Sequence, residues 1–170
     1  MTPKNINSDS DMQMEQFMNN TCEFKQLLVP IDFGEPSTRA LELSISLARR
    51  FGAGLTIAHF WDVPGYAYVG ATYGVPDWAP QIAATAEELV EKTLATVRAS
   101  LPNATSMCRA GPAWQGILNA IGEVSADLVV MGTHGRHGVS RILLGSVAEK
   151  VVRLSPVPVL TVPAASAPAR

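Results

Sequence analysis

Short apolar runs alternate with helical patterns along most of this chain, and this alternation restricts its fold more than any other feature. The runs cover residues 26–31, 55–60, 104–109, 128–131 and 157–162, of which 104–109 is polar in part and predicts only a weak strand. Between them, apolar residues recur every three or four positions, as on one face of a helix. Strands that alternate with helices predict a parallel sheet, and right-handed crossovers place helices on both of its faces. We therefore expect an open, doubly wound, Rossmann-like α/β sheet.

Glycine and proline mark the expected helix ends. Pro36 lies close to the start of the first helix and Gly52 is expected to end it. The second helix is expected over 81–100, the third after Gly111-Pro112, and the fourth over 146–154. Pro156 and Pro158 bracket a turn into the last apolar run and indicate an edge strand or a strand start.

The 170 residues are most simply one domain, which we place at 24–163. Residues 1–23 are rich in Asn, Ser, Asp, Gln and Met and predict a flexible N-terminal extension. The small and polar residues 164–170 predict a disordered tail. The segment from 62 to about 80 carries most of the tyrosines and tryptophans, and so long a loop in a small domain is usually functional or mobile.

Composition excludes several classes of protein. Apolar residues make up 47% of the chain and charged residues 16%, as in a globular domain. The net charge of -2 gives no general basic footprint for nucleic acid. No apolar run is long enough for a membrane span, and residues 1–20 do not resemble a secretory signal. Cys22 and Cys108 fit no metal or redox spacing and are read as free thiols, so we expect a cytoplasmic protein.

A glycine constellation follows the fourth apolar run. Gly132-Thr133-His134-Gly135 is separated by nine residues from Gly145-Ser146, which opens the last helical pattern. A strand, a glycine loop and a helix in that order present backbone N–H groups and a helix N-terminus to an anion. The chain has no Gly-x4-Gly-Lys-Ser/Thr motif, so this is not a P-loop.

The full set of motifs resembles the universal stress protein family of the nucleotide-binding kind. The residues that carry the resemblance are 27–32 (Leu-Leu-Val-Pro-Ile-Asp), His59, 131–135 (Met-Gly-Thr-His-Gly), 145–152 (Gly-Ser-Val-Ala-Glu-Lys-Val-Val) and 156–160 (Pro-Val-Pro-Val-Leu). The pattern Gly-x2-Gly-x9-Gly-Ser is the family's ATP-binding signature and is intact here.

The resemblance implies a five-stranded parallel sheet in the order 3-2-1-4-5, of the adenine nucleotide alpha hydrolase-like type. It also implies a homodimer in which the last strands, Val157 to Val162 here, pair antiparallel across the subunits. An apolar edge strand without a partner would be a liability, so such pairing is physically reasonable.

Several residues have both a structural and a binding interpretation. Pro30, Ile31 and Phe60 fit core packing, but by family position they would flank adenine, whose site needs flat apolar walls and backbone amides. Met131 should approach the adenosine part. Asp32 is either a helix N-cap or turn former, or a carboxylate that binds ribose hydroxyls, adenine or a metal near phosphate.

The phosphate candidates lie around the glycines. Gly132, Gly135 and Gly145 are either loop punctuation or a phosphate cradle, and their spacing favours the cradle. Ser146 forms a capping box with Glu149, yet its hydroxyl and the N–H groups of Ser146 and Val147 also suit a terminal phosphate.

The loop between the glycines carries charge that either faces solvent or meets phosphate. We group Thr133, His134 and Arg136 with the nucleotide site, with His137 and Arg141 nearby. A Mg²⁺ or Mn²⁺ ion held by Asp32 is the further candidate for balancing phosphate charge. His59 is read as a structural histidine at a strand end.

Three functions remain open. The chain is a dimeric, nucleotide-binding regulatory protein whose ATP occupancy is read by an unknown protein partner, or a slow ATPase, or a dimeric interaction module without nucleotide. No convincing base, nucleophile or Walker lysine for fast phosphoryl transfer is present, so we assign no catalytic residue, and only His134 is a plausible proton-transfer group. The intact glycines argue against the third function.

Overall fold

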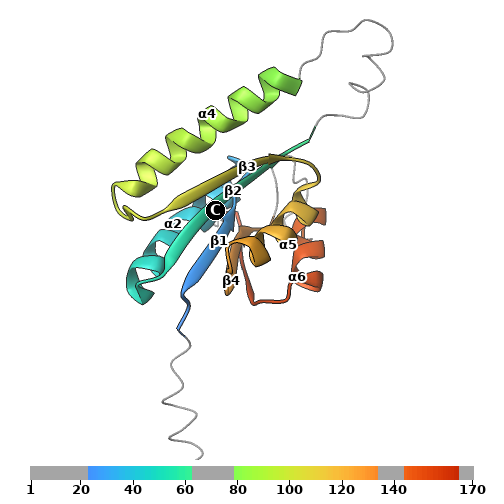
Figure 1. Ribbon diagram of the computed structural model, residues 1–170. Helices are drawn as coiled ribbons and strands as arrows, with labels where there is room; N and C mark the ends of the chain where they lie inside the picture. Colours follow the sequence, from blue (N-terminus) through green and yellow to red (C-terminus); the bar gives the residue numbers. More distant parts are fainter. Residues whose placement is uncertain (1–22, 63–78, 134–143, 165–170) are drawn as a thin grey trace, which may run out of the picture.

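A computed structural model describes residues 23–62, 79–133 and 144–164 of the chain. The described chain alternates strands and helices as the sequence predicts (Figure 1). Its elements are β1 (Gln26–Pro30), α2 (Glu35–Phe51), β2 (Gly54–Trp61), α4 (Ala79–Arg98), β3 (Thr105–Ala110), α5 (Ala113–Glu123), β4 (Leu128–Gly132), α6 (Ser146–Leu154) and β5 (Val159–Val162). The expected extension and tail, and nearly all of the long loop, lie outside the described residues.

The five strands form one parallel sheet in the order β3-β2-β1-β4-β5, so the expected fold is confirmed. The strand order reverses between β1 and β4, which are neighbours although β2 and β3 come between them in the chain. Ligands of such sheets bind beyond the carboxyl ends of the strands at this switch point. The fold therefore directs attention to the ends of β1 and β4.

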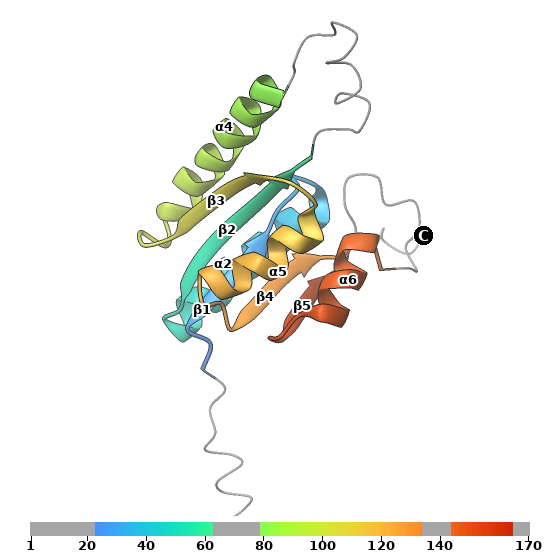
Figure 2. The same cartoon turned by 45° about the vertical axis from the view of Figure 1, so that its right-hand side comes forward.

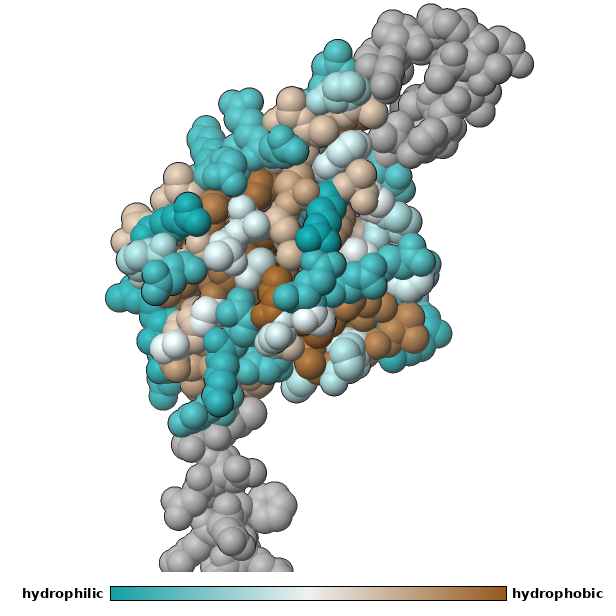
Figure 3. Space-filling view, viewed as in Figure 1, coloured by the Kyte–Doolittle hydropathy of each residue, from teal (hydrophilic) through white to brown (hydrophobic). Residues whose placement is uncertain are grey.

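Helices cover both faces of the sheet (Figure 2). One core lies between the sheet and helices α2 and α4, and the other lies between the sheet and helices α5 and α6. Leu27, Leu28 and Val29 of β1 are all fully buried, because successive side chains of this central strand enter opposite cores. In Figure 3, hydrophilic side chains surround patches of apolar ones on one face of the molecule.

Helix α2 illustrates how local sequence sets the element bounds. Gly34 is its N-cap, Pro36 lies in its first turn, and the left-handed Gly52 (φ 65°) ends it, as expected. The last strand is shorter than the expected 157–162. Val157 and Pro158 precede it, although the Pro158 carbonyl still accepts a 3.0 Å hydrogen bond from the Val129 N–H. The prolines thus delay the start of β5.

Candidate functional site

The turn that follows β1 is built around Asp32. The Asp32 Oδ1 atom accepts hydrogen bonds from Ser37 Oγ at 2.6 Å and from the Gly34 N–H at 3.0 Å. Gly34, rather than Asp32, is the N-cap of α2. Asp32 is therefore a turn former, one of the two structural roles considered for it, and its carboxylate is held in a fixed place at the end of β1.

His59 ties the end of β2 to the same turn. Its Nδ1 atom lies 2.7 Å from the Ile31 carbonyl oxygen, and its ring lies 4.8 Å from the Phe33 ring, between centroids. Phe33 adopts a positive φ of 62°, a conformation that is unusual for a bulky residue. The sequence pointed to His59 as a structural residue, and its contacts agree.

The hydrogen bonds of β2 show which neighbouring strand the Phe60 backbone faces, because alternate residues of a strand face opposite neighbours. The Ala58 carbonyl accepts from the Ile31 N–H at 2.8 Å, so Ala58 faces β1, whereas the Trp61 carbonyl faces β3 and accepts from the Gly111 N–H. Phe60 is two residues after Ala58, so its backbone also faces the β1 side, and β1 ends at Pro30. The backbone N–H and C=O of Phe60 thus point toward the switch point, beyond the end of β1.

The apolar candidates pack mainly in the two cores. Ile31 belongs to the core under α2, and Met131 to the core under α5 and α6; their exposed fractions are 6% and 5%. Pro30 is also buried. Phe60 is partly buried, and a Cβ at Gly116 of α5 would lie 2.2 Å from its ring. The structural interpretation therefore describes these side chains.

Gly132 lies where β4 meets the first turn of α2. A Cβ at this position would lie 2.8 Å from the Pro36 Cβ and 2.9 Å from the Ser37 backbone nitrogen. The bond from the Thr133 N–H to the Val162 carbonyl, at 3.0 Å, continues the ladder toward β5. The glycine thus lets β4 and α2 approach closely, a packing role that spacing alone does not reveal.

One hydrogen bond brings the two glycine segments together. The Gly145 N–H donates to the Thr133 carbonyl at 2.8 Å, so residues 132–133 adjoin residues 145–146 at the carboxyl end of β4. The first helical N–H groups of α6 follow directly, and such groups have no acceptor within their own helix. Backbone donors and a helix N-terminus therefore meet at the switch-point edge, an arrangement suited to an anion.

The capping box expected at Ser146 is wrong. The N-cap of α6 is Gly145 in an extended conformation (φ -62°, ψ 153°), and no side chain caps the helix. Ser146 is exposed and is already the first helical residue, whereas a capping serine stands at the N-cap and accepts from an N–H two or three residues further along. The Glu149 carboxylate forms an ion pair with Arg153 one turn later. The binding interpretation of Ser146 stays a prediction.

Sequence reasoning missed four residues that shape this edge. They are Phe33, Gly34, Ser37 and Gly116. Only Gly116 leaves a clear signal, because a glycine inside a helical pattern indicates close packing. The loop candidates His134, Gly135 and Arg136, with His137 and Arg141, lie outside the described residues. Among the residues that the structure describes, no three His, Cys, Asp or Glu side chains are grouped to hold a metal ion.

Solved structures share this fold. UspA from Lactobacillus plantarum superposes with a TM-score of 0.68 at 23% identity, over 82% of this chain and 98% of that chain. A universal stress protein in complex with cAMP gives 0.60 at 22% identity, over 84% and 99% of the two chains. One from Archaeoglobus fulgidus in complex with dAMP gives 0.56 at 17% identity, over 82% and 98%.

Sequence relatives carry the same family name. The chain is 34% identical to a universal stress protein of Thermus aquaticus, over 82% of this chain and 98% of the relative. It is 30% identical to one of Methanocaldococcus jannaschii, over 82% of each chain. It spans only 45% of the length of a 28% identical relative from Mycobacterium tuberculosis, which matches 76% of this chain. The model of the universal stress protein family matches residues 23–163. This chain therefore belongs to the universal stress protein family.

Proposed function

We propose that the chain binds an adenine nucleotide, ATP in particular, at the carboxyl ends of β1, β2 and β4. The observation that carries the proposal is the hydrogen bond from the Gly145 N–H to the Thr133 carbonyl. It gathers the ends of the glycine signature beside the N-terminus of α6, where backbone donors suit a phosphate chain. The complexes of two structural neighbours with cAMP and dAMP agree with an adenine ligand in this fold.

The proposed roles follow from position along this edge. The backbone of Phe60, with Pro30, Ile31 and Met131 around it, would hold the base, and Asp32 at the end of β1 would lie near the ribose. The phosphates would lie against Gly132, Thr133 and Gly145 and the N–H groups of Ser146 and Val147. His134, Gly135 and Arg136 belong to the segment that joins these glycines in the sequence.

A divalent cation would enter with the nucleotide. Asp32 is the carboxylate that follows β1, and its Oδ1 atom already accepts two hydrogen bonds. One carboxylate does not make a metal site of its own, but Mg²⁺ is commonly held by one carboxylate together with substrate phosphates and water. We therefore propose that Mg²⁺ or Mn²⁺ binds through the phosphates, with Asp32 as the protein's contribution.

We further propose that the domain at 24–163 acts as a regulatory homodimer joined through its last strand. β5 is the terminal strand of the sheet, and Val152, Leu154 and Leu160 expose 46%, 53% and 38% of their surface in or near it. Pairing between two β5 strands would satisfy the open backbone edge and bury these side chains. Nucleotide occupancy would then be read by a protein partner.

Identifying any small molecule that copurifies with the protein tests this function. The chain is prepared without added nucleotide and denatured, and the released small molecules are identified by mass spectrometry. We expect ATP close to one per chain, whereas recovery mainly as ADP or AMP would point to turnover. A protein that is empty and also gives no heat when titrated with ATP and Mg²⁺ would contradict the proposal and favour an interaction module without nucleotide.

A further inference from the structure

The ladder between β1 and β2 is interrupted at its last step. In a parallel ladder, a residue donates its N–H to one residue of the partner strand and accepts from the residue two positions later. The Ile31 N–H donates to the Ala58 carbonyl at 2.8 Å, so the regular continuation is a bond from the Phe60 N–H to the Ile31 carbonyl. Within the described part of the chain, no backbone bond joins these two groups.

The His59 side chain takes the place of that bond. Its Nδ1 atom lies 2.7 Å from the Ile31 carbonyl oxygen. A carbonyl oxygen only accepts, so the neutral ring must carry its proton on Nδ1. The imidazole thus satisfies the acceptor that the Phe60 amide would otherwise use, and the Phe60 N–H stays directed toward the switch point.

The Phe33 ring holds the imidazole in this position. Its centroid lies 4.8 Å from that of His59, with the two planes inclined by 53°. Phe33 adopts its left-handed conformation in the turn that Asp32 and Ser37 fix. Strained residues persist where the surrounding structure holds them, and they gather at ligand sites. The turn therefore places an aromatic ring against the histidine that displaces the ladder bond.

We propose that His59 is a positioning residue for base recognition: by hydrogen-bonding the Ile31 carbonyl, it releases the Phe60 N–H to donate to the N1 acceptor of adenine. This inference rests on the proposed nucleotide function and deepens it. A backbone donor without a partner is costly, so a strand end that keeps one directed at the switch point suits a ligand with an acceptor. His59 itself need not touch the nucleotide.

The ligand-free protein gives the first test. Scalar coupling across hydrogen bonds, measured by NMR, reports whether the Phe60 N–H is bonded to the Ile31 carbonyl. We expect no coupling in the natural protein and a coupling in His59→Phe, which keeps a ring against Phe33 but has no donor. Coupling in the natural protein would overturn the inference. This result does not depend on whether the protein binds nucleotide, so the two proposals fail separately.

Calorimetry with two nucleotides gives the second test. We expect His59→Phe to bind ATP about tenfold more weakly, the scale of one lost hydrogen bond to the base. His59→Asn, whose amide nitrogen occupies the place of Nδ1, should restore most of the affinity. 1-deaza-ATP has a C–H in place of the N1 acceptor. The natural protein should bind it about tenfold more weakly than ATP, and His59→Phe should lose that preference.

Two results would overturn the role of His59. One is a His59→Phe variant that keeps its preference for ATP over 1-deaza-ATP. The other is a His59→Asn variant that is folded, as judged by its melting temperature, and yet as weak as His59→Phe. A general loss of structure would lower the affinity for both nucleotides equally, so the ratio separates positioning from stability.

Discussion

At the scale of single residues, Gly132 has a close-packing role beside its proposed place in the nucleotide site. A Cβ there would lie 2.8 Å from the Pro36 side chain and 2.9 Å from backbone atoms of Pro36 and Ser37, which cannot easily move. We expect Gly132→Ala to lower the free energy of unfolding by about 1–3 kcal/mol in urea denaturation. Gly122→Ala is the matched control because a Cβ there meets nothing within 4 Å, and it should be neutral or slightly stabilising.

Gly132→Ala as stable as the natural protein would contradict the close approach of β4 and α2. This site also shows what the sequence can and cannot predict. The spacing of Gly132 and Gly145 predicts a loop that approaches a ligand. The contact of Gly132 with Pro36 depends on how two elements meet in space, and no local pattern encodes it.

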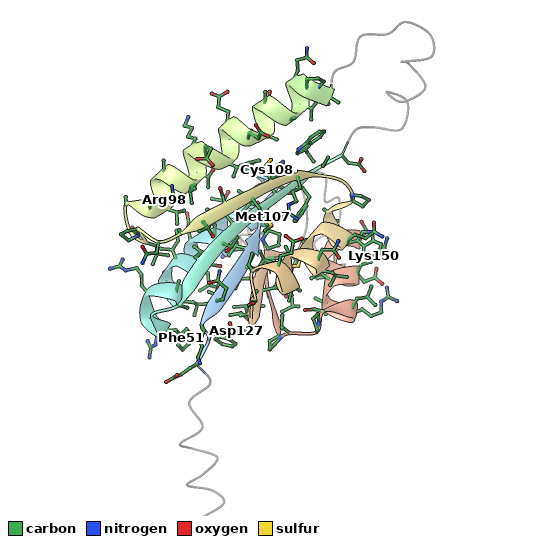
Figure 4. All side chains as sticks on the ribbon, in the orientation of Figure 1. Phe51, Arg98, Met107, Cys108, Asp127 and Lys150 are labelled. Atoms are coloured by element: carbon green, nitrogen blue, oxygen red, sulfur yellow. The ribbon has the colours of Figure 1, made fainter. Side chains whose placement is uncertain are left out.

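The rate at which the Cys108 thiol is alkylated tests the environment that the structure gives it. It lies on β3 near α4 (Figure 4), and burial together with the negative charge of Glu87 raises the pKa of its thiol. Since the thiolate is the reactive form, alkylation by iodoacetamide should be slow near pH 8 and rise only above the usual thiol range. In a Cys22→Ser background, Glu87→Gln should speed the reaction, because removing the negative charge lowers the pKa.

Glu91→Gln is the control for that change, since Glu91 lies one turn further along α4 and accepts a hydrogen bond from Ser106 instead. It should leave the alkylation rate nearly unchanged. Equal rates for Glu87→Gln and the starting protein at every pH would contradict the contribution of Glu87.

At the scale of elements, a polar chain of side chains joins three strands near their starts. Gln26 Nε2 donates to Thr56 Oγ1 at 2.9 Å, and Thr56 Oγ1 lies 2.9 Å from Thr105 Oγ1, so β1, β2 and β3 are linked side chain to side chain. Thr56 exposes only 2% of its surface. We expect Thr56→Val to lower the free energy of unfolding by about 1–3 kcal/mol, because it removes both hydrogen bonds that the buried Thr56 hydroxyl makes.

Thr85→Val serves as the comparison in the same denaturation series. Thr85 is exposed on α4, and its hydroxyl donates a hydrogen bond to the Gln81 carbonyl of the same helix. Its replacement should therefore change the free energy of unfolding by less than about 0.5 kcal/mol. Equal effects at the two positions would show that the polar chain adds no more to stability than an exposed threonine does.

The elements also show why the fold was more predictable than the site. Buried parallel strands give continuous apolar runs such as 26–31, and helices give regular stripes, so both types of element can be read locally. The hydrogen bond from His59 to Ile31 and the packing of Phe60 on Gly116 join residues far apart in the sequence. The prediction of a capping box was wrong because the N-cap of α6 is Gly145 and not Ser146, and the exact start of a helix is hard to fix from sequence.

At the scale of the whole molecule, the two edges of the sheet differ. β3 lies beside α4, whereas β5 carries Leu160 with exposed Val152 and Leu154 on the preceding helix. If two chains pair through β5, Leu160→Asp should convert dimers to monomers in size-exclusion chromatography with light scattering. A buried charge at the interface centre without a partner is strongly destabilising.

Leu89→Asp is the matched control, because Leu89 is also 38% exposed but lies on α4. It should leave the dimer intact. A natural protein that is monomeric, or a Leu89→Asp variant that dissociates while Leu160→Asp does not, would contradict pairing through β5.

None of the helices in the described part of the chain has the length and apolar character of a membrane span.

The central claim is the location of the nucleotide, and an amide-resolved NMR titration with ATP tests it most directly. We expect the largest shifts at Phe60, Thr133, Ser146 and Val147, with little change at Thr105 at the opposite end of the sheet. Gly145→Val should abolish these shifts without unfolding, because the φ of -62° at Gly145 is allowed for any residue. Shifts centred elsewhere, or unchanged binding in Gly145→Val, would contradict the account.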